Sequence, residues 1–251
     1  MAFDEKKLYG LIGYPLTHSY SRVYFNNKFE SEGIDAEYIN FEIPDVGDFM
    51  EVMAEYPQLQ GLNVTIPYKQ QVIPYMNSLD EEARIIGAVN VIKIIRKGDD
   101  FTLKGYNSDV VGFRDSIAPL INDSRRKALI LGTGGASRAV AHGLSTLGVD
   151  SVFVSRTARD GVITYADITP EIMATHKVIV NTTPLGMYPH VDECPAIPYD
   201  LLTPEHLCYD LLYNPDVTLF MKKARSQGAV VKNGLEMLLL QAFESWRIWN
   251  L

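Results

Sequence analysis

The first half of the chain alternates strand-like and helix-like segments. Short apolar or alternating stretches at residues 7–13, 36–43 and 61–66 predict three strands. Two predicted helices lie between them, at residues 21–31 and 46–56, and the second carries its large apolar side chains on one side. This order predicts βαβ crossovers and a largely parallel sheet.

The third predicted strand ends in a group of polar residues. Residues 61–69 read G-L-N-V-T-I-P-Y-K, and Pro67 ends the strand because proline has no N–H for the ladder. Asn63, Thr65 and Lys69 are therefore expected at the carboxyl end of a strand, where open α/β sheets bind ligands. A solvated surface lysine is the alternative interpretation. A helix is expected over residues 68–76, which Pro74 would limit or kink.

Two serines follow the first predicted strand. Ser19 and Ser21 lie in a loop marked by glycine and proline, and Ser21 is well placed to cap the next helix. The local interpretation is one cap and one loop hydroxyl. The functional interpretation is a pair of hydroxyls that hold a polar ligand, and this stretch alone leaves both open.

Two further polar residues precede predicted elements. Asn90 lies among small apolar residues after a short helix at residues 80–86, so its amide needs a partner, either backbone or a ligand hydroxyl. Asp109 opens a helical pattern, where the helix dipole favours an ionised carboxylate. An ionised aspartate near Lys69 would orient the lysine and take part in proton transfer.

A glycine-rich turn opens the second half. An apolar strand at residues 128–131 runs into G-T-G-G-A-S-R-A, and a helix follows to Leu147. Glycines let the backbone approach a pyrophosphate, which binds at the helix N-terminus. Ser137 stands where the usual fingerprint has its third glycine. In this context the turn predicts a dinucleotide site made of Gly132, Thr133, Gly134, Gly135 and Ala136.

The next strand, residues 151–154, ends in S-R-T-A-R. An NAD enzyme usually has an acidic residue at this point to bind the ribose hydroxyls. Ser155 and Arg156 stand there instead, with Arg159 close by, and a guanidinium suits a 2′-phosphate. The pattern favours NADP over NAD, and a pair of solvated arginines is the alternative.

The remaining pattern continues the alternation of strands and helices. Gln241 is a polar residue on a mostly apolar terminal helix, either exposed or turned toward a substrate. The predicted strands are residues 177–180, 207–210 and 228–232, and the predicted helices are 218–226 and 234–251.

Composition narrows the class of protein. The chain has 251 residues, 47% hydrophobic and 22% charged, which is ordinary for a globular protein. A net charge of −8 argues against a nucleic-acid footprint. Two cysteines and five scattered histidines suggest neither a disulfide framework nor a metal site. The N-terminus lacks an apolar signal core, and no apolar run has bilayer length, so we expect a soluble cytoplasmic protein.

Taken together, these stretches resemble the shikimate dehydrogenase family nearly end to end. Each motif is weak alone, but their shared order is highly specific. They are H-S-Y-S at 18–21, N-V-T-I-P-Y-K at 63–69, I-G-A-V-N at 86–90, N-S-D at 107–109, G-T-G-G-A-S-R-A at 132–139, S-R-T at 155–157, N-T-T-P-L-G-M at 181–187, Y-N-P at 213–215 and G-L-E-M-L-x-x-Q at 234–241.

The resemblance implies an α/β fold of two domains with the active site in a cleft between them. Residues 1–106 would form an N-terminal α/β substrate-binding domain, to which the C-terminal helix, 234–251, would return. Residues 107–233 would form a Rossmann-type NADP-binding domain. The stretch from Arg159 to Lys177 is short for the family, so we expect one trimmed helix.

The implied reaction is the reversible, NADPH-linked reduction of 3-dehydroshikimate to shikimate, in chorismate and aromatic amino-acid biosynthesis. Lys69 and Asp109 would be the catalytic pair. The substrate would contact Ser19, Ser21, Thr65, Asn90, Tyr213 and Gln241. NADP(H) would contact Gly132, Thr133, Gly134, Gly135, Ala136, Ser155, Arg156, Thr157, Arg159, Leu211 and Gly234, and no metal would be bound.

Two other functions stay open. One is a quinate/shikimate dehydrogenase that uses either NAD or NADP. The other is a catalytically idle, ligand-binding regulatory protein, against which the presence of both Lys69 and Asp109 argues. The expected partner is a small-molecule substrate, with no nucleic acid or membrane, and the chain is expected to be a monomer or homodimer.

Overall fold

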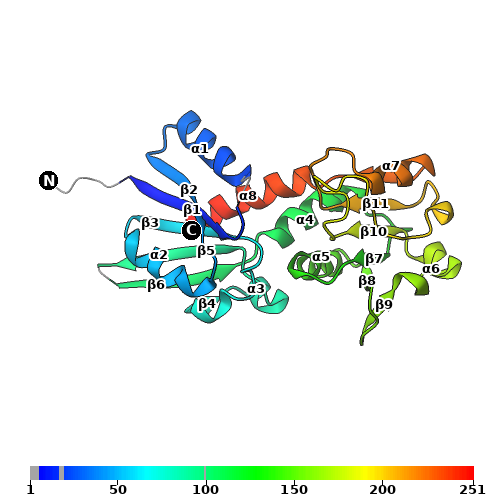
Figure 1. Ribbon diagram of the computed structural model, residues 1–251, viewed down its shortest axis with the longest axis horizontal. Helices are drawn as coiled ribbons and strands as arrows, with labels where there is room; N and C mark the ends of the chain where they lie inside the picture. The colour runs from blue at the N-terminus through cyan, green and yellow to red at the C-terminus, as the bar shows by residue number, and fades with distance from the viewer. Residues whose placement is uncertain (1–5, 17–19, 99) are drawn as a thin grey trace. The chain divides into compact units, whose positions relative to one another are not determined.

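The computed structural model describes residues 6–16, 20–98 and 100–251 (Figure 1). The chain forms two compact units. Unit 1 comprises Met1–Ser108 together with Ala242–Leu251, and unit 2 comprises Asp109–Gln241. Ser19, one of the predicted substrate residues, lies outside the described residues. The predicted α/β class is confirmed, because each unit is a sheet covered by helices.

The sheet of unit 1 is mixed, and the expectation of a largely parallel sheet was only partly right. β1 pairs in parallel with both β2 and β3, but β5 runs antiparallel to β3 and to β6. The short turn between β5 and β6 allows only an antiparallel pair, since a parallel one needs a long crossover. The strand order is β2-β1-β3-β5-β6-β4, with β1 Lys7–Gly13, β2 Ala36–Glu42, β3 Leu59–Val64, β4 Ser78–Leu79, β5 Val91–Lys97 and β6 Asp100–Tyr106.

Alternate residues of these strands build two cores. On β1, Leu8 and Ile12 join one cluster, whereas Tyr9 and Leu11 join the other, because successive side chains point to opposite faces. The first cluster packs on α2 (Phe49–Glu55), which follows the 3-10 turn Val46–Asp48. The second packs on α1 (Tyr20–Glu32) and on the end of α8 (Leu235–Trp249).

Two local predictions in unit 1 were wrong. α1 begins at Tyr20, so Ser21 lies in its first turn and is not its cap. Residues 68–76 form turns and one 3-10 helix, Ile73–Tyr75, instead of an α-helix, because prolines at 67 and 74 remove N–H groups that a helix needs. α3 (Glu81–Ile86) forms as expected, capped by Asp80.

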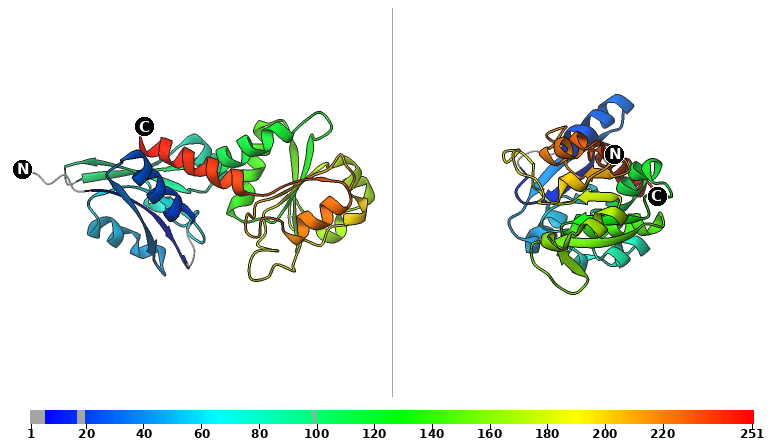
Figure 2. Two further views of the ribbon diagram at one scale, coloured as in Figure 1. Left: turned by 90° about the horizontal axis from the view of Figure 1, so that it is seen from above. Right: turned by 90° about the vertical axis from the view of Figure 1, so that its right-hand side faces the viewer.

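Unit 2 contains a parallel sheet covered on both faces. Its order is β12-β11-β10-β7-β8-β9, the doubly wound arrangement of a Rossmann-type fold. α4, α5 and the start of α8 pack on one face, and α6 and α7 pack on the other (Figures 1 and 2). The bounds are α4 Asp109–Ile117, β7 Lys127–Leu131, α5 Gly135–Thr146, β8 Asp150–Ser155, β9 Val162–Thr164, α6 Pro170–Thr175, β10 Val178–Asn181, β11 Leu207–Asp210, α7 Leu219–Ser226 and β12 Val230–Lys232; further 3-10 turns are Ala118–Leu120, Tyr165–Asp167 and Tyr199–Leu201.

The trimmed helix is confirmed and lies between β8 and β9. Residues 156–161, all of them described, form turns and no helix, where a doubly wound fold normally has a crossover helix. β9 is only three residues long and pairs with the last three residues of β8. Residues 156–161 are therefore enough to bring the chain from the end of β8 to the start of β9. The end of β8, with its arginines, is therefore not followed by a helix.

Candidate active site

The turn after β3 holds Lys69 beside Asn90. Thr65 is the first residue after the strand, and its N–H donates to the carbonyl of Ile12 at 3.0 Å. The carbonyl of Lys69 accepts from the N–H of Val89 at 2.7 Å. Backbone hydrogen bonds thus fix the Lys69 main chain next to the residue before Asn90, and three predicted site residues meet at one edge of the sheet.

Asn90 is held in a single orientation. Its side chain, 2% exposed, donates to the Ser108 hydroxyl at 3.0 Å and accepts from the Ser108 N–H at 2.6 Å. Both ends of the amide are engaged by one residue, so a flip would place an N–H against an N–H. Asn90 thus has protein partners, one of them the backbone N–H expected from the sequence, and its role toward a ligand stays a prediction.

A buried tyrosine hydroxyl lies near Ser21. Burial raises the pKa of Tyr38 well above its ordinary value, and the nearby Ser21 hydroxyl opposes this shift. The Tyr38 hydroxyl donates to the Asn63 side chain at 2.9 Å. Tyr38 was not singled out from the sequence, and Asn63 was expected with Thr65 and Lys69 at the end of β3 but without a substrate role.

Three predicted residues belong to unit 2. Asp109 is the first residue of α4, as expected, and is buried. Tyr213 follows β11 in a loop and is 39% exposed, and Gln241 lies within α8. Lys69 lies in unit 1 and Asp109 in unit 2, so the two members of the predicted catalytic pair come from different units.

The glycine turn after β7 suits a pyrophosphate. Gly134 is the N-cap of α5, and a Cβ built on Gly134 or Gly135 would meet no atom within 4 Å. Gly132 has a φ of 111°, which favours glycine, and a Cβ there would lie 2.6 Å from the Thr182 hydroxyl. Open space at a helix N-terminus with its dipole is where phosphate groups bind.

One arginine from the segment after β8 contacts this turn. The Arg159 guanidinium donates a hydrogen bond to the Thr133 hydroxyl, within the glycine turn itself. Arg156 directly follows β8; burial raises the pKa of Tyr165, and the positive charge of Arg156 lowers it. A guanidinium at the glycine turn suits a phosphate group of a dinucleotide.

A buried carboxylate ties the two neighbouring loops together. Asp210, which is fully buried at the end of β11, accepts from the Asn181 side chain at 3.0 Å and the Leu212 N–H at 3.1 Å. The Thr218 hydroxyl donates to its other oxygen at 2.6 Å. Burial raises the pKa of Asp210 to about 6, although all three donors lower it.

This carboxylate also fixes the region of two predicted cofactor residues. A Cβ on Gly234 would lie 2.0 Å from the carbonyl oxygen of Leu211, so only glycine allows this approach. The Gly234 N–H donates to the carbonyl of Leu212 at 2.9 Å. Sequence reasoning missed Asp210, although an acidic residue that ends an apolar strand is a signal that could have been followed.

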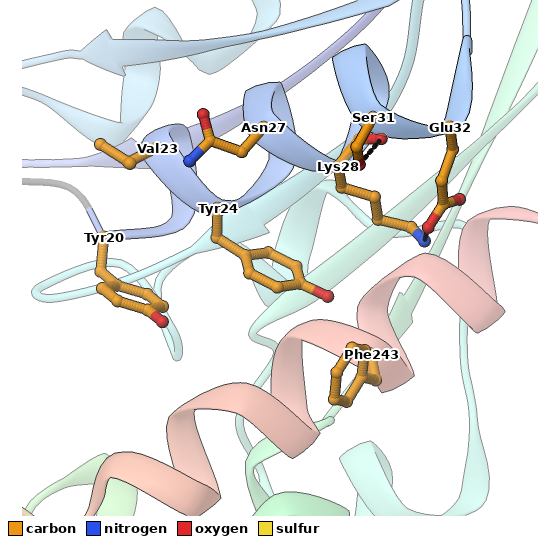
Figure 3. A pocket seen from close by; sticks show the side chains of 8 residues that line it. All are labelled: Tyr20, Val23, Tyr24, Asn27, Lys28, Ser31, Glu32 and Phe243. Carbon is orange, nitrogen blue, oxygen red and sulfur yellow. Dashed lines mark hydrogen bonds and ion pairs between the residues drawn. The ribbon is translucent and has the colours of Figure 1, made fainter.

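A groove in unit 1 lies apart from these residues. It is lined by residues of α1 and by Phe243 of α8 (Figure 3), and within it Lys28 and Glu32 form an ion pair at 2.5 Å. None of the predicted catalytic or substrate residues lines it, so we do not take it as the active site. Its lining is Tyr20, Val23, Tyr24, Asn27, Lys28, Ser31, Glu32 and Phe243.

Within the described part of the chain, no three His, Cys, Asp or Glu side chains are grouped so as to hold a metal ion. No helix in the same residues combines the length and the apolar character needed to cross a bilayer.

Known proteins resemble the chain over nearly its whole length. Residues 11–92 match the shikimate dehydrogenase substrate binding domain. The shikimate dehydrogenase (NADP(+)) of Carboxydothermus hydrogenoformans is 38% identical, over 96% of this chain and 92% of that protein. This chain belongs to the shikimate dehydrogenase family. The crystal structure of the Aquifex aeolicus shikimate dehydrogenase superposes with a TM-score of 0.86, at 33% identity, over 100% of this chain and 94% of that one.

The same fold serves a related dehydrogenase. Quinate dehydrogenase from Corynebacterium glutamicum, solved in complex with NAD, superposes with a TM-score of 0.85 at 28% identity, over 97% of this chain and 93% of that one. Membership of the shikimate dehydrogenase family makes the chain an oxidoreductase, and the site residues decide which substrate and cofactor fit.

Proposed function

We propose that this chain catalyses the reversible, NADPH-linked reduction of 3-dehydroshikimate to shikimate. The observation that carries the proposal is a near full-length match to NADP-dependent shikimate dehydrogenases, combined with Lys69, Thr65 and Asn90 at one sheet edge. Unit 1 is proposed to bind the substrate and unit 2 to bind NADP(H). The reaction serves chorismate and aromatic amino-acid biosynthesis.

The proposed chemistry needs a proton donor and an ordered polyol. When bound, NADPH supplies the hydride for the substrate carbonyl carbon. Lys69 donates a proton to the carbonyl oxygen or polarises it as a cation, and Asp109 orients the lysine. The substrate carboxylate and hydroxyls are proposed to bind to Ser19, Ser21, Thr65, Asn90, Tyr213 and Gln241, because a polyol acid needs many hydrogen-bonding groups.

The proposed NADP(H) site follows the carboxyl ends of the parallel strands in unit 2. The open backbone at Gly134 and Gly135 is assigned to the pyrophosphate, and Arg156 and Arg159 to the 2′-phosphate. Leu211 and Gly234, whose backbones approach each other closely, are assigned to the nicotinamide side. The remaining proposed contacts are Gly132, Thr133, Ala136, Ser155 and Thr157.

We also propose a cytoplasmic enzyme that acts as a monomer or homodimer. Both cysteines, Cys194 and Cys208, are free thiols, which suits a reducing compartment. Burial raises the pKa of the Cys208 thiol to about 12, so it is an unreactive core residue.

A spectrophotometric assay of the reduced nicotinamide tests the proposal. The purified chain is combined with shikimate or quinate and with NADP or NAD, in all four pairings. We expect turnover with shikimate and NADP to exceed that of the other pairings clearly. Comparable turnover of quinate, or a preference for NAD, would support a quinate/shikimate dehydrogenase, and shikimate binding without turnover would support an idle scaffold.

A further inference from the structure

A continuous network of buried side-chain hydrogen bonds runs through unit 1. It begins at Tyr38, whose hydroxyl donates to the Asn63 carbonyl oxygen at 2.9 Å. The Asn63 amide nitrogen donates to the Ser245 hydroxyl at 2.8 Å. The Ser245 and Ser108 hydroxyls are 3.3 Å apart, and Ser108 pairs with Asn90.

The interior of this hydrogen-bond network is shielded from solvent. Tyr38, Ser108 and Ser245 are each 0% exposed. Their hydroxyls therefore cannot exchange a lost partner for water as surface groups do, and each bond restricts the next side chain. The network ends at Asn90, a residue to which we assign the substrate.

Ser245 is the central residue of the network, because its hydroxyl joins Asn63 to Ser108. It lies on α8, whereas Asn63 lies on β3 and Ser108 immediately precedes α4, so its hydroxyl joins segments far apart in sequence. On the same helix Phe243 is 52% exposed and lines the groove (Figure 3). Two residues further on, Ser245 is fully buried.

We propose that Ser245 is a positioning residue for substrate binding, which sets the orientation of Asn90 through the Asn63–Ser245–Ser108 hydrogen bonds. This inference rests on the proposed function. Without the Ser245 hydroxyl, the Asn63 amide nitrogen is left with a long bond of 3.4 Å to the Asn90 carbonyl, and Ser108 loses a neighbour. The substrate residues then have to be ordered at the expense of binding energy.

The test is Ser245→Ala in the full chain, with steady-state kinetics for shikimate and for NADP. We expect KM for shikimate to rise about ten-fold, because each unpaired buried group costs a factor of this order. The value of kcat and KM for NADP should change less than about two-fold, since Ser245 contacts neither reacting atoms nor the proposed cofactor site. An unchanged KM for shikimate in an active protein would overturn the inference.

Ser116→Ala is the matched control. Ser116 is also a buried serine that bonds to a tyrosine hydroxyl, Tyr209 at 2.7 Å, and to a backbone carbonyl, but it lies in unit 2. Its loss tests whether any buried serine would have the same effect. An equal rise in KM for shikimate in this control would mean that the Ser245 effect is general destabilisation, which contradicts the inference.

A second variant keeps the test valid if Ser245→Ala does not fold. Tyr38→Phe removes one hydroxyl from the same hydrogen-bond network and leaves the ring in its aromatic cluster. It should also raise KM for shikimate, and the double variant should be less than multiplicative if both act through Asn63. Multiplicative effects would refute the coupling. A parent chain with no shikimate turnover would overturn the proposed function as well, whereas normal kinetics of both variants would overturn only this inference.

Discussion

At the scale of single residues, Lys69 is the group on which the proposed chemistry depends. Its main chain is anchored by the Val89 hydrogen bond, so replacement of the side chain should leave the turn in place. We predict that Lys69→Ala lowers kcat by roughly 10² to 10⁴-fold, the usual contribution of a general acid, with little change in KM for shikimate.

Lys97→Ala is the control for this prediction. Lys97 is an exposed lysine at the end of β5 in the same unit, so its loss changes the net charge equally. Its kinetics should match the parent chain. A Lys69→Ala protein with near-normal turnover would show that another group supplies the proton.

Most candidate site residues could be proposed from the sequence, but their hydrogen-bond partners could not. The polar ends of β3 and the glycine turn were visible because they interrupt apolar runs. Ser245 was not, since it stands 182 positions from its partner Asn63 and nothing local marks it. Asp210 carried a local signal, an acidic residue at the end of an apolar strand, but its donors Asn181, at the end of β10, and Thr218, the cap of α7, could not be predicted.

At the scale of elements, hydrogen bonds to the buried Asp210 side chain connect the end of β10 with the loop after β11. A buried carboxyl with a raised pKa has a definite effect on stability. The folded form holds its proton up to about pH 6, whereas the ordinary value is 3.8. As pH rises between these values, the unfolded state loses this proton first, so the free energy of unfolding falls, by about 3 kcal/mol for a shift of two units, and then stays level.

We predict that Asp210→Asn removes this part of the pH dependence. An amide keeps an acceptor oxygen for the Asn181 and Leu212 donors but has no proton to lose. Urea unfolding at a series of pH values from about 4 to 7 should give a flatter curve for the variant than for the parent chain.

The exposed Asp192 provides the comparison for this measurement. Asp192→Asn should leave the pH dependence of the free energy of unfolding as it is in the parent chain, because Asp192 is an exposed loop residue. Parallel curves for the parent chain and Asp210→Asn would mean that the Asp210 carboxyl titrates equally in the folded and unfolded states.

Elements of ordinary length followed the sequence pattern, and very short ones did not. β4 and β9 have two and three residues, too few to show a period of two. The helix expected at 68–76 does not form. The prediction gave too little weight to Pro67 and Pro74, which lack the N–H groups that a helix needs. The trimmed crossover was predictable because its length was visible directly.

At the scale of the whole molecule, unit 1 is assembled from both ends of the chain. The C-terminal residues pack into its aromatic core, where the Trp249 ring lies 4.8 Å from Tyr9 and its N–H donates to the Ile92 carbonyl at 3.1 Å. A Cβ on Gly61 would lie 2.3 Å from the same ring, so β3 needs a glycine there. Unit 2 is continuous, from Asp109 to Gln241.

This construction gives the protein a natural optical label. Its only two tryptophans, Trp246 and Trp249, both belong to unit 1 and to the same aromatic cluster. Their emission therefore reports the loss of unit 1 alone, whereas far-ultraviolet circular dichroism reports both units. We predict that the two signals give different urea midpoints, and superimposable curves would show that both units unfold in one step.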